Sequence, residues 1–390
     1  MSDKQKRIVL DPGAKKRRIR RIILFALIFV LVCGGVLLYV FRDRLPIDTL
    51  RRDLRSLGFD VPEPEGKFSF DSNNFNLFAP FGSGLAVVSN SGVTTYDASG
   101  KQLSLTQVQM SAPSVRGGDR CLLVFDAGGS RLYSARPNSK TALDLTTEKP
   151  VFDADLSRDG YICYATSETG YKTVLNVYND SRELTYRWLS ASTFMPVCAI
   201  SEKGTYLAAG TLGQRDGEYE SSITVFRTDS GAEAQTVFPV GKDYLYDLTF
   251  FGADTICAIG ESGVYLFGLD GASRGELLYG DSVLKDFSTE GDGFLTLILN
   301  TYQAGNHSSI VTVGAAGEEL GRVGIEGQLL DLSVSGGYAA LLTPEMLTVY
   351  DKTLTPVARR ENTKGYTHAV QHADGSVILI ADGRGELYLP

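Results

Sequence analysis

The chain contains 390 residues, of which 43% are hydrophobic and 22% charged, and its formal net charge is −8. The charge is unevenly divided, because residues 1–21 carry nine Lys or Arg against two Asp, which leaves a net −15 on the remainder. So acidic a body excludes nucleic acid as its partner, since phosphate backbones bind basic surfaces.

The first element in chain order is an uncharged apolar stretch, residues 22–41. A helix of twenty residues rises about 30 Å, the thickness of the hydrocarbon core, so we predict one transmembrane helix here. The basic residues 1–21 outweigh the flank behind the span, and the positive-inside rule therefore puts this tail in the cytoplasm and the rest of the chain outside. The expected location is the plasma membrane, crossed once.

Two other interpretations of this stretch fit less well. A cleaved signal peptide needs a small-residue cleavage site after a shorter apolar core, and none follows. A lipoprotein signal would modify Cys33, but Val32 precedes it where a small residue is needed, and the apolar run continues beyond it.

Residues 42–66 are expected to connect the membrane span to the body. Pro46 and Gly58 bound a predicted amphipathic stalk helix, in which apolar residues recur at three- and four-residue steps: Ile47, Leu50, Leu54 and Leu57. A stiff spacer of Pro and Glu, residues 61–66, follows.

Residues 67–390 repeat one pattern of short apolar runs separated by turn residues. Eight turn positions, each followed by an apolar run, recur at intervals of 35 to 50 residues: Gly84, Asp119, Gly160, Gly204, Asp254, Gly293, Gly337 and Gly375. Four antiparallel strands in about 40 to 45 residues are typical of a propeller blade, whose sheet needs a neighbour on either side. We therefore predict an all-β fold, an eight-bladed β-propeller, with seven blades as the alternative.

The last unit supplies only three strands before Pro390. We expect residues 67–71 to add the missing outer strand, because joining the two ends of the propeller in one sheet closes the ring and hides its free edges.

Three units carry long links between their predicted second and third strands, at residues 166–172, 211–221 and 300–309. Because strands alternate in direction, all such links emerge on one face of the ring, where insertions commonly build a binding surface. The candidate binding residues are the polar and aromatic side chains of these links: Tyr171, Lys172, Arg215, Asp216, Glu218, Tyr219, Tyr302, Gln303, Asn306 and His307.

The sequence shows no catalytic or metal-binding motif. The three His residues have no ligand spacing, and no nucleophile elbow occurs. Four of the five Cys residues lie in predicted strands, where we expect buried free thiols. We therefore assign no catalytic residue, metal or cofactor, and a binding protein is favoured over an enzyme.

The layout of basic tail, single anchor, short stalk and propeller body resembles the uncharacterised membrane-anchored propellers of Gram-positive bacteria, of the domain of unknown function 5711 type. The repeats also look like WD40 and quinoprotein-type propellers in general. They lack the Trp-Asp dipeptide, and Trp188 is the one tryptophan, so the recurrent tryptophans of quinoprotein repeats are missing. The resemblance implies the propeller fold and transfers no functional residue.

The function that these patterns favour is a membrane-anchored, extracytoplasmic binding, scaffold or sensor module for a protein or a cell-envelope glycan. The alternative is an envelope glycan lyase or glycosidase that uses carboxylates in the central channel.

Overall fold

The structure is a computed structural model that describes residues 66–72, 75–137, 139, 141–215, 217–230, 236–301, 308–325 and 327–390. The predicted basic tail, membrane span and stalk lie outside these residues. Within the part of the chain that is described, no helix is long and apolar enough to cross a membrane.

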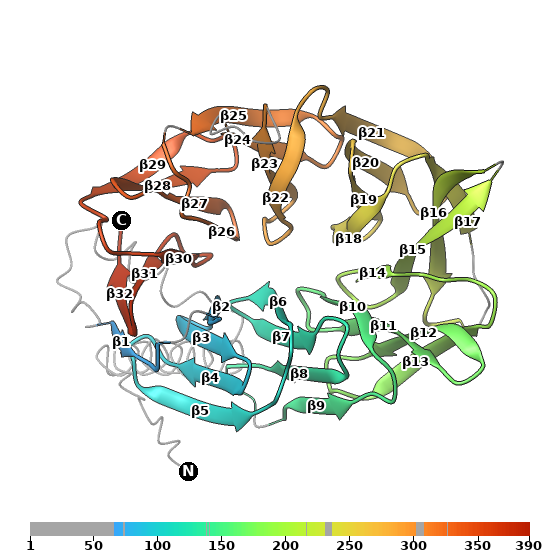
Figure 1. Ribbon diagram of the computed structural model, residues 1–390, viewed down its shortest axis with the longest axis horizontal. Helices are drawn as coiled ribbons and strands as arrows, with labels where there is room; N and C mark the ends of the chain where they lie inside the picture. Colours follow the sequence, from blue (N-terminus) through green and yellow to red (C-terminus); the bar gives the residue numbers. More distant parts are fainter. Residues whose placement is uncertain are drawn as a thin grey trace, which may run out of the picture. The chain divides into compact units, whose positions relative to one another are not determined.

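The described residues form eight four-stranded antiparallel sheets arranged as blades around a ring (Figure 1). The predicted eight-bladed, all-β propeller is therefore confirmed. Blades 1 to 4 consist of β2 (Leu77–Phe81), β3 (Gly84–Ser89), β4 (Gly92–Tyr96) and β5 (Gln102–Gln107); β6 (Pro113–Gly118), β7 (Cys121–Asp126), β8 (Arg131–Ala135) and β9 (Leu143–Thr146); β10 (Val151–Leu156), β11 (Ile162–Glu168), β12 (Tyr171–Tyr178) and β13 (Leu184–Ser190); and β14 (Val197–Ile200), β15 (Tyr206–Arg215), β16 (Glu218–Arg227) and β17 (Thr236–Gly241).

The second half of the ring follows the same plan. Blades 5 to 8 consist of β18 (Leu245–Phe251), β19 (Thr255–Gly260), β20 (Gly263–Gly268) and β21 (Ser273–Leu278); β22 (Val283–Ser288), β23 (Phe294–Asn300), β24 (Ser308–Gly314) and β25 (Glu319–Ile325); β26 (Asp331–Ser335), β27 (Tyr338–Leu342), β28 (Met346–Asp351) and β29 (Pro356–Glu361); and β30 (His368–Gln371), β31 (Val377–Ala381), β32 (Arg384–Tyr388) and β1 (Lys67–Ser69).

The eight turn positions found in the sequence all mark the passage from the first to the second strand of a blade. Gly84 begins β3, and the other seven lie in the turns themselves. Gly160 and Gly204 have φ angles of +88° and +68°, which L residues with a side chain rarely adopt. The conformational demand of these tight turns therefore explains why the repeat could be recognised from its turn residues.

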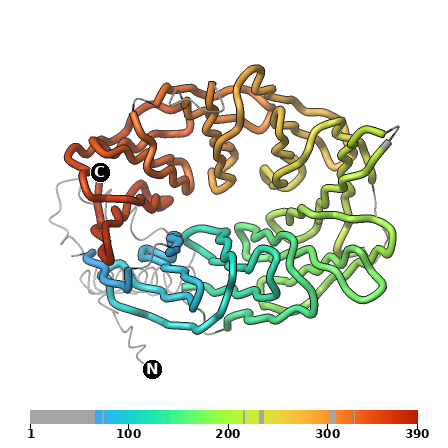
Figure 2. The backbone as a smooth tube through the Cα atoms, viewed as in Figure 1, coloured from blue at the N-terminus to red at the C-terminus, as the bar shows by residue number. Residues whose placement is uncertain are grey.

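The ring closes between the two ends of the described chain. β1 pairs with β32 in antiparallel register, Lys67 opposite Glu386 and Ser69 opposite Arg384, so blade 8 takes its outer strand from the N-terminal side. Figure 2 shows the blue and red segments side by side at this point. The predicted closing strand is confirmed.

The hydrophobic core is divided among the interfaces between neighbouring blades. Eight clusters of buried residues are present, and each joins one pair of adjacent blades. In β3, Leu85 and Val87 contact blade 8 whereas Ala86 and Val88 contact blade 2. Successive side chains of a strand point to opposite faces of its sheet, so the middle strands are buried on both faces and are mostly apolar.

The four strands of a blade differ in exposure. The first strand lies nearest the centre of the ring and the fourth at its outside (Figure 1). In blade 5 all six residues of β19 are buried, whereas the outer strand β21 alternates between exposed and half-buried positions. Several residues of the inner strands carry charge, among them Arg116, Asp153 and Asp247.

Candidate functional site

We call the side of the ring that carries the links between second and third strands, and the links from one blade to the next, the hairpin face. The opposite side, which carries the turns between first and second strands, is called the turn face. This division follows from the antiparallel order of the strands in every blade. Of the predicted binding residues that the structure describes, Tyr171, Lys172, Glu218 and Tyr219 lie on the hairpin face.

The first predicted loop, residues 166–172, is shorter than expected. β11 continues to Glu168 and β12 starts at Tyr171, and these two residues pair across a two-residue turn. Tyr171 and Lys172 therefore begin a strand, where both side chains are exposed. They lie at the edge of the hairpin face, and the predicted long loop is a two-residue turn.

The second predicted loop is a projecting β-hairpin. β15 and β16 pair continuously as far as Arg215 opposite Glu218. β15 loses its inner neighbour β14 after Gly210, and β16 pairs with its outer neighbour β17 only from Ser221 onward. Residues 211–215 and 218–220 thus form a two-stranded arm beyond the sheet, which we call the blade-4 arm.

The blade-4 arm exposes an aromatic side chain. Tyr219 is 71% exposed, and Glu218 beside it forms an ion pair with Lys242 in the link to blade 5. Asp216 and the side chain of Arg215 lie outside the described residues. The third predicted loop follows β23 and precedes β24, and its candidate residues also lie outside the described residues: Tyr302, Gln303, Asn306 and His307.

Further aromatic residues on the hairpin face were not predicted from the sequence. Tyr244 and Tyr246, at the start of β18, are exposed, and their ring centroids lie 5.5 Å apart. Phe194, in the link from blade 3 to blade 4, is exposed and packs on Phe152 with a centroid separation of 5.2 Å. An aromatic residue next to the start of an inner strand is the signal that would have found them.

Exposed large hydrophobic side chains are concentrated on the hairpin face. The remaining exposed ones belong to the outer strands β5, β13, β17 and β29, where Leu184, Val237 and Val357 lie at or next to the turn-face ends. The hairpin-face set lies in the links or at the strand ends on that side: Phe75, Leu77, Tyr171, Leu189, Phe194, Tyr219, Tyr244, Tyr246, Leu278 and Val283. Ten of the fifteen exposed large hydrophobic side chains among the described residues therefore lie on this side of the ring.

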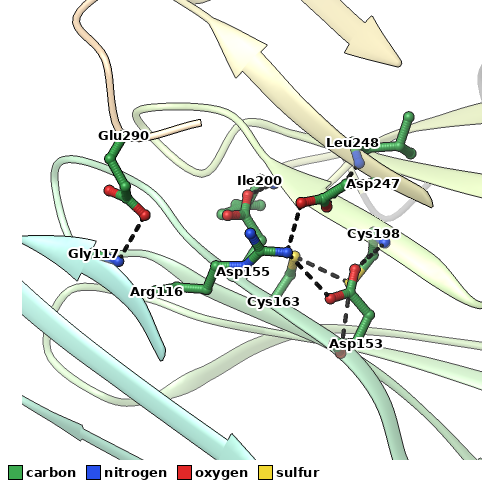
Figure 3. A network of polar contacts seen from close by, with 10 residues as sticks. All are labelled: Arg116, Gly117, Asp153, Asp155, Cys163, Cys198, Ile200, Asp247, Leu248 and Glu290. Carbon is green, nitrogen blue, oxygen red and sulfur yellow. Dashed lines mark hydrogen bonds and ion pairs between the residues drawn. The ribbon is translucent and has the colours of Figure 1, made fainter. Parts of the chain in front are cut away.

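The centre of the ring contains a charged network contributed by inner strands. Arg116 of β6 extends its Nη2 to Asp247 Oδ2 of β18 at 2.6 Å and lies 3.9 Å from Asp153 Oδ1 of β10 (Figure 3). Because blades 3 and 4 separate the blades of Arg116 and Asp247 along the chain, this ion pair spans the ring.

Two carboxyl groups of β10 also hold the neighbouring inner strand. Asp153 Oδ2 accepts a hydrogen bond from the backbone N–H of Cys198, and Asp155 Oδ2 accepts one from Ile200, each at 2.9 Å. Both donors belong to β14, whose inner edge has no partner strand in its own sheet. These aspartates therefore satisfy backbone donors between blades 3 and 4, as Figure 3 shows.

Burial and neighbouring charges shift the pKa values of the ionisable side chains in this network. Desolvation raises the pKa of Asp155 to about 7, and desolvation together with the negative charge of Asp247 raises that of Asp153 to about 7. Burial also raises the pKa of Glu290, whereas the charge of Asp247 raises the pKa of Arg116. The guanidinium stays charged, whereas Asp153 and Asp155 beside it titrate near neutral pH.

The turn-face side of the centre is bridged as well. Glu290 Oε1 accepts a hydrogen bond of 3.0 Å from the N–H of Gly117, which links blade 6 to blade 2. Arg158 of blade 3 pairs with Asp292 of blade 6 at 2.8 Å. Side chains thus cross the ring at several levels. Among the described residues, no group of three or more His, Cys, Asp or Glu is placed to hold a metal ion.

A family model described as a family of unknown function (DUF5711) matches residues 65–384. The chain belongs to this family. The resemblance to DUF5711 propellers found in the sequence is therefore confirmed. The comparison with curated proteins finds no match.

Solved structures similar to this DUF5711 propeller have low sequence identity to it. Hydrazine synthase of Kuenenia stuttgartiensis has 15% identity and a TM-score of 0.44, covering 85% of this chain and 98% of its own. BamB of Moraxella catarrhalis has 14% identity and a TM-score of 0.45, covering 84% and 99%. Hsv2 of Kluyveromyces lactis has 13% identity and a TM-score of 0.46, covering 74% and 99%. These likenesses leave the function of the DUF5711 chain unassigned.

Proposed function

We propose that this DUF5711 protein is a membrane-anchored binding module, which recognises a partner protein outside the cell membrane through the hairpin face of its propeller. The observation that carries the proposal is the gathering of exposed aromatic and aliphatic side chains on that face. The predicted span at residues 22–41 would hold the module at the plasma membrane.

The chemistry of the hairpin face suits a protein partner. Tyr219, Tyr244 and Tyr246 offer large, fairly rigid apolar surfaces with a polar tip, the combination that dominates binding energy at protein interfaces. The blade-4 arm adds strand edges without a neighbour in the ring, to which an extended peptide can hydrogen-bond. A cell-envelope glycan offers no such backbone pattern, so the arm favours a protein.

Site-specific photocrosslinking in living cells tests this proposal. A photoreactive phenylalanine derivative replaces Tyr219 or Tyr244 in the full-length protein, and a matched control carries it at Leu184, an exposed position of outer strand β13. We expect one discrete protein adduct from each of the first two positions and none from Leu184. Adducts to glycan alone would identify the other partner class, and identical adducts at all three positions would refute a specific interaction surface.

A glycan lyase or glycosidase is the second candidate, because one observation favours it. Burial brings the pKa of Asp153 and Asp155 to about 7, the range required of a general acid. Both carboxyl groups, however, already accept backbone hydrogen bonds from β14. Release of sugar fragments from isolated envelope glycan by the purified protein, lost in Asp155→Asn, would establish this activity; no release by the unaltered protein would remove it.

A further inference from the structure

Two cysteines from adjacent blades meet inside the propeller. Cys163 lies on β11 of blade 3 and Cys198 on β14 of blade 4, and their sulfur atoms are 3.5 Å apart. Both side chains are fully buried in the cluster that joins these two blades. Figure 3 shows the two sulfurs beside Asp153.

This contact differs from the surroundings of the other described cysteines. Cys121 Sγ lies near Ser134 Oγ, at 3.8 Å, and near Arg182 Nη2, at 3.0 Å. Cys257 belongs to the cluster between blades 5 and 6. Among the cysteines that the structure describes, the Cys163–Cys198 pair alone has a sulfur-to-sulfur contact.

We propose that Cys163 and Cys198 form a disulfide that joins blades 3 and 4 when the protein folds in the presence of a disulfide oxidant. A disulfide bond is about 2.05 Å long, so the sulfurs need to approach by about 1.5 Å from their 3.5 Å contact. The inference stands on the geometry and does not require the proposed binding function.

The chemistry needs an oxidant of the disulfide class, such as a protein disulfide or glutathione disulfide. One cysteine thiolate attacks the oxidant, forms a mixed disulfide and releases the first thiolate. The second cysteine thiolate then attacks the protein sulfur of that mixed disulfide and releases the second thiolate. Two electrons pass to the oxidant, and the two protons of the cysteines end on its released thiols.

The environment of the pair sets when this reaction occurs. Burial raises the pKa of Cys163, and the hydrogen bond with Cys163 followed by burial raises the pKa of Cys198. Neither sulfur is accessible or ionised in the folded ring, so the bond forms before blades 3 and 4 close on one another. Once formed it is shielded from reductants in the same way.

Refolding with a defined oxidant tests the proposal. The full-length protein in detergent is unfolded in urea with reductant, refolded with glutathione disulfide, alkylated with N-ethylmaleimide in urea, and mapped by mass spectrometry. We expect a Cys163–Cys198 cross-linked peptide in most molecules, while Cys121 and Cys257 are alkylated. The cross-link should resist a phosphine reductant in the native protein and yield to it in urea.

Matched variants separate a specific cross-link from random oxidation. Cys257→Ala should retain the cross-link, whereas in Cys163→Ala it should disappear and Cys198 should become alkylated. Alkylation of both Cys163 and Cys198 in the refolded, unaltered protein overturns the proposal. So does the pairing of either residue with a different cysteine as the main product.

Discussion

At the scale of single residues, the centre of the ring depends on Arg116. Its guanidinium lies among four carboxyl groups, and the charges of all four raise its pKa: Asp247, Asp153, Asp155 and Glu290. Asp247 is almost fully buried, so its negative charge needs this partner. The network therefore holds blades together across the ring and leaves these carboxyl groups engaged.

We expect Arg116→Met to lower the free energy of unfolding by about 3 to 5 kcal/mol, because it leaves a buried charge without its partner. The double variant Arg116→Met/Asp247→Leu should recover at least half of that loss, since neither charge remains. The midpoint of urea unfolding measures both effects. A single variant as stable as the unaltered protein would show that the 2.6 Å pair contributes nothing.

Asp155 gives the protein a characteristic dependence on pH. Its pKa is about 7 in the folded ring and near 3.8 when the chain is unfolded. Between these values the folded protein holds the additional proton, so this group's contribution to stability is greatest below pH 4 and is lost as the pH rises towards 7.

Asp155→Asn should therefore make the thermal midpoint depend less on pH. The unaltered protein should show a thermal midpoint that decreases between pH 5.5 and pH 8, and the variant should show a smaller decrease. Asp281→Asn, at an exposed position, is the control and should follow the unaltered protein. An unchanged slope in Asp155→Asn would contradict the raised pKa.

The inner-strand carboxylates also show where residue-level prediction stops. Asp153 and Asp155 stand in an alternating pattern, Asp-Ala-Asp, that is equally compatible with a surface strand. Their function depends on the N–H groups of β14, which come from another blade. A contact of that kind has no local signal in the sequence.

At the scale of strands and turns, we expect the blade-4 arm to contribute to partner recognition but little to the stability of the ring. Because the arm extends beyond the neighbouring strands, replacing residues 213–220 with Asn-Gly, a favoured two-residue turn, should change the urea midpoint little. The same replacement should abolish the protein adduct formed from position 244. Persistence of that adduct would exclude the arm from the interface, and Leu184→Ser serves as the control.

The closing strand β1 is expected to matter more than its three residues suggest. Phe68 is 2% exposed and packs edge-on against Tyr96 of blade 1, with ring centroids 6.2 Å apart. Phe68→Ala should cost about 3 to 5 kcal/mol in the free energy of unfolding and make blade 8 sensitive to limited proteolysis. Leu103→Ala, on an exposed outer strand, should have an effect below about 0.5 kcal/mol.

The elements were predictable where turns or burial impose a local requirement. Turn residues at regular intervals and mostly apolar middle strands predicted the eight blades and the closing strand. The extension of β15 and β16 was missed because residues 213–220 are mostly polar and lack the alternation of a half-buried strand. Their strand conformation comes from pairing with each other alone.

At the scale of the whole molecule, the predicted anchor puts the propeller, and with it the hairpin face, outside the cell membrane. We expect protease added to intact protoplasts to degrade the propeller and to leave an epitope tag ahead of residue 1 protected. Detergent lysis before digestion is the control and should expose the tag. Protection of the propeller in intact protoplasts would reverse the predicted orientation.

The pairing of Lys67 with Glu386 also determines the order of assembly. Blades 1 to 7 each form from consecutive strands and can assemble while the ribosome is still working, whereas blade 8 waits for the other end of its sheet. A product truncated before β32 would leave β1 without its partner and expose unpaired strand edges that promote aggregation. Until the last blade closes, these strand edges stay exposed. Quality-control proteases can thereby distinguish an unfinished ring from a finished one.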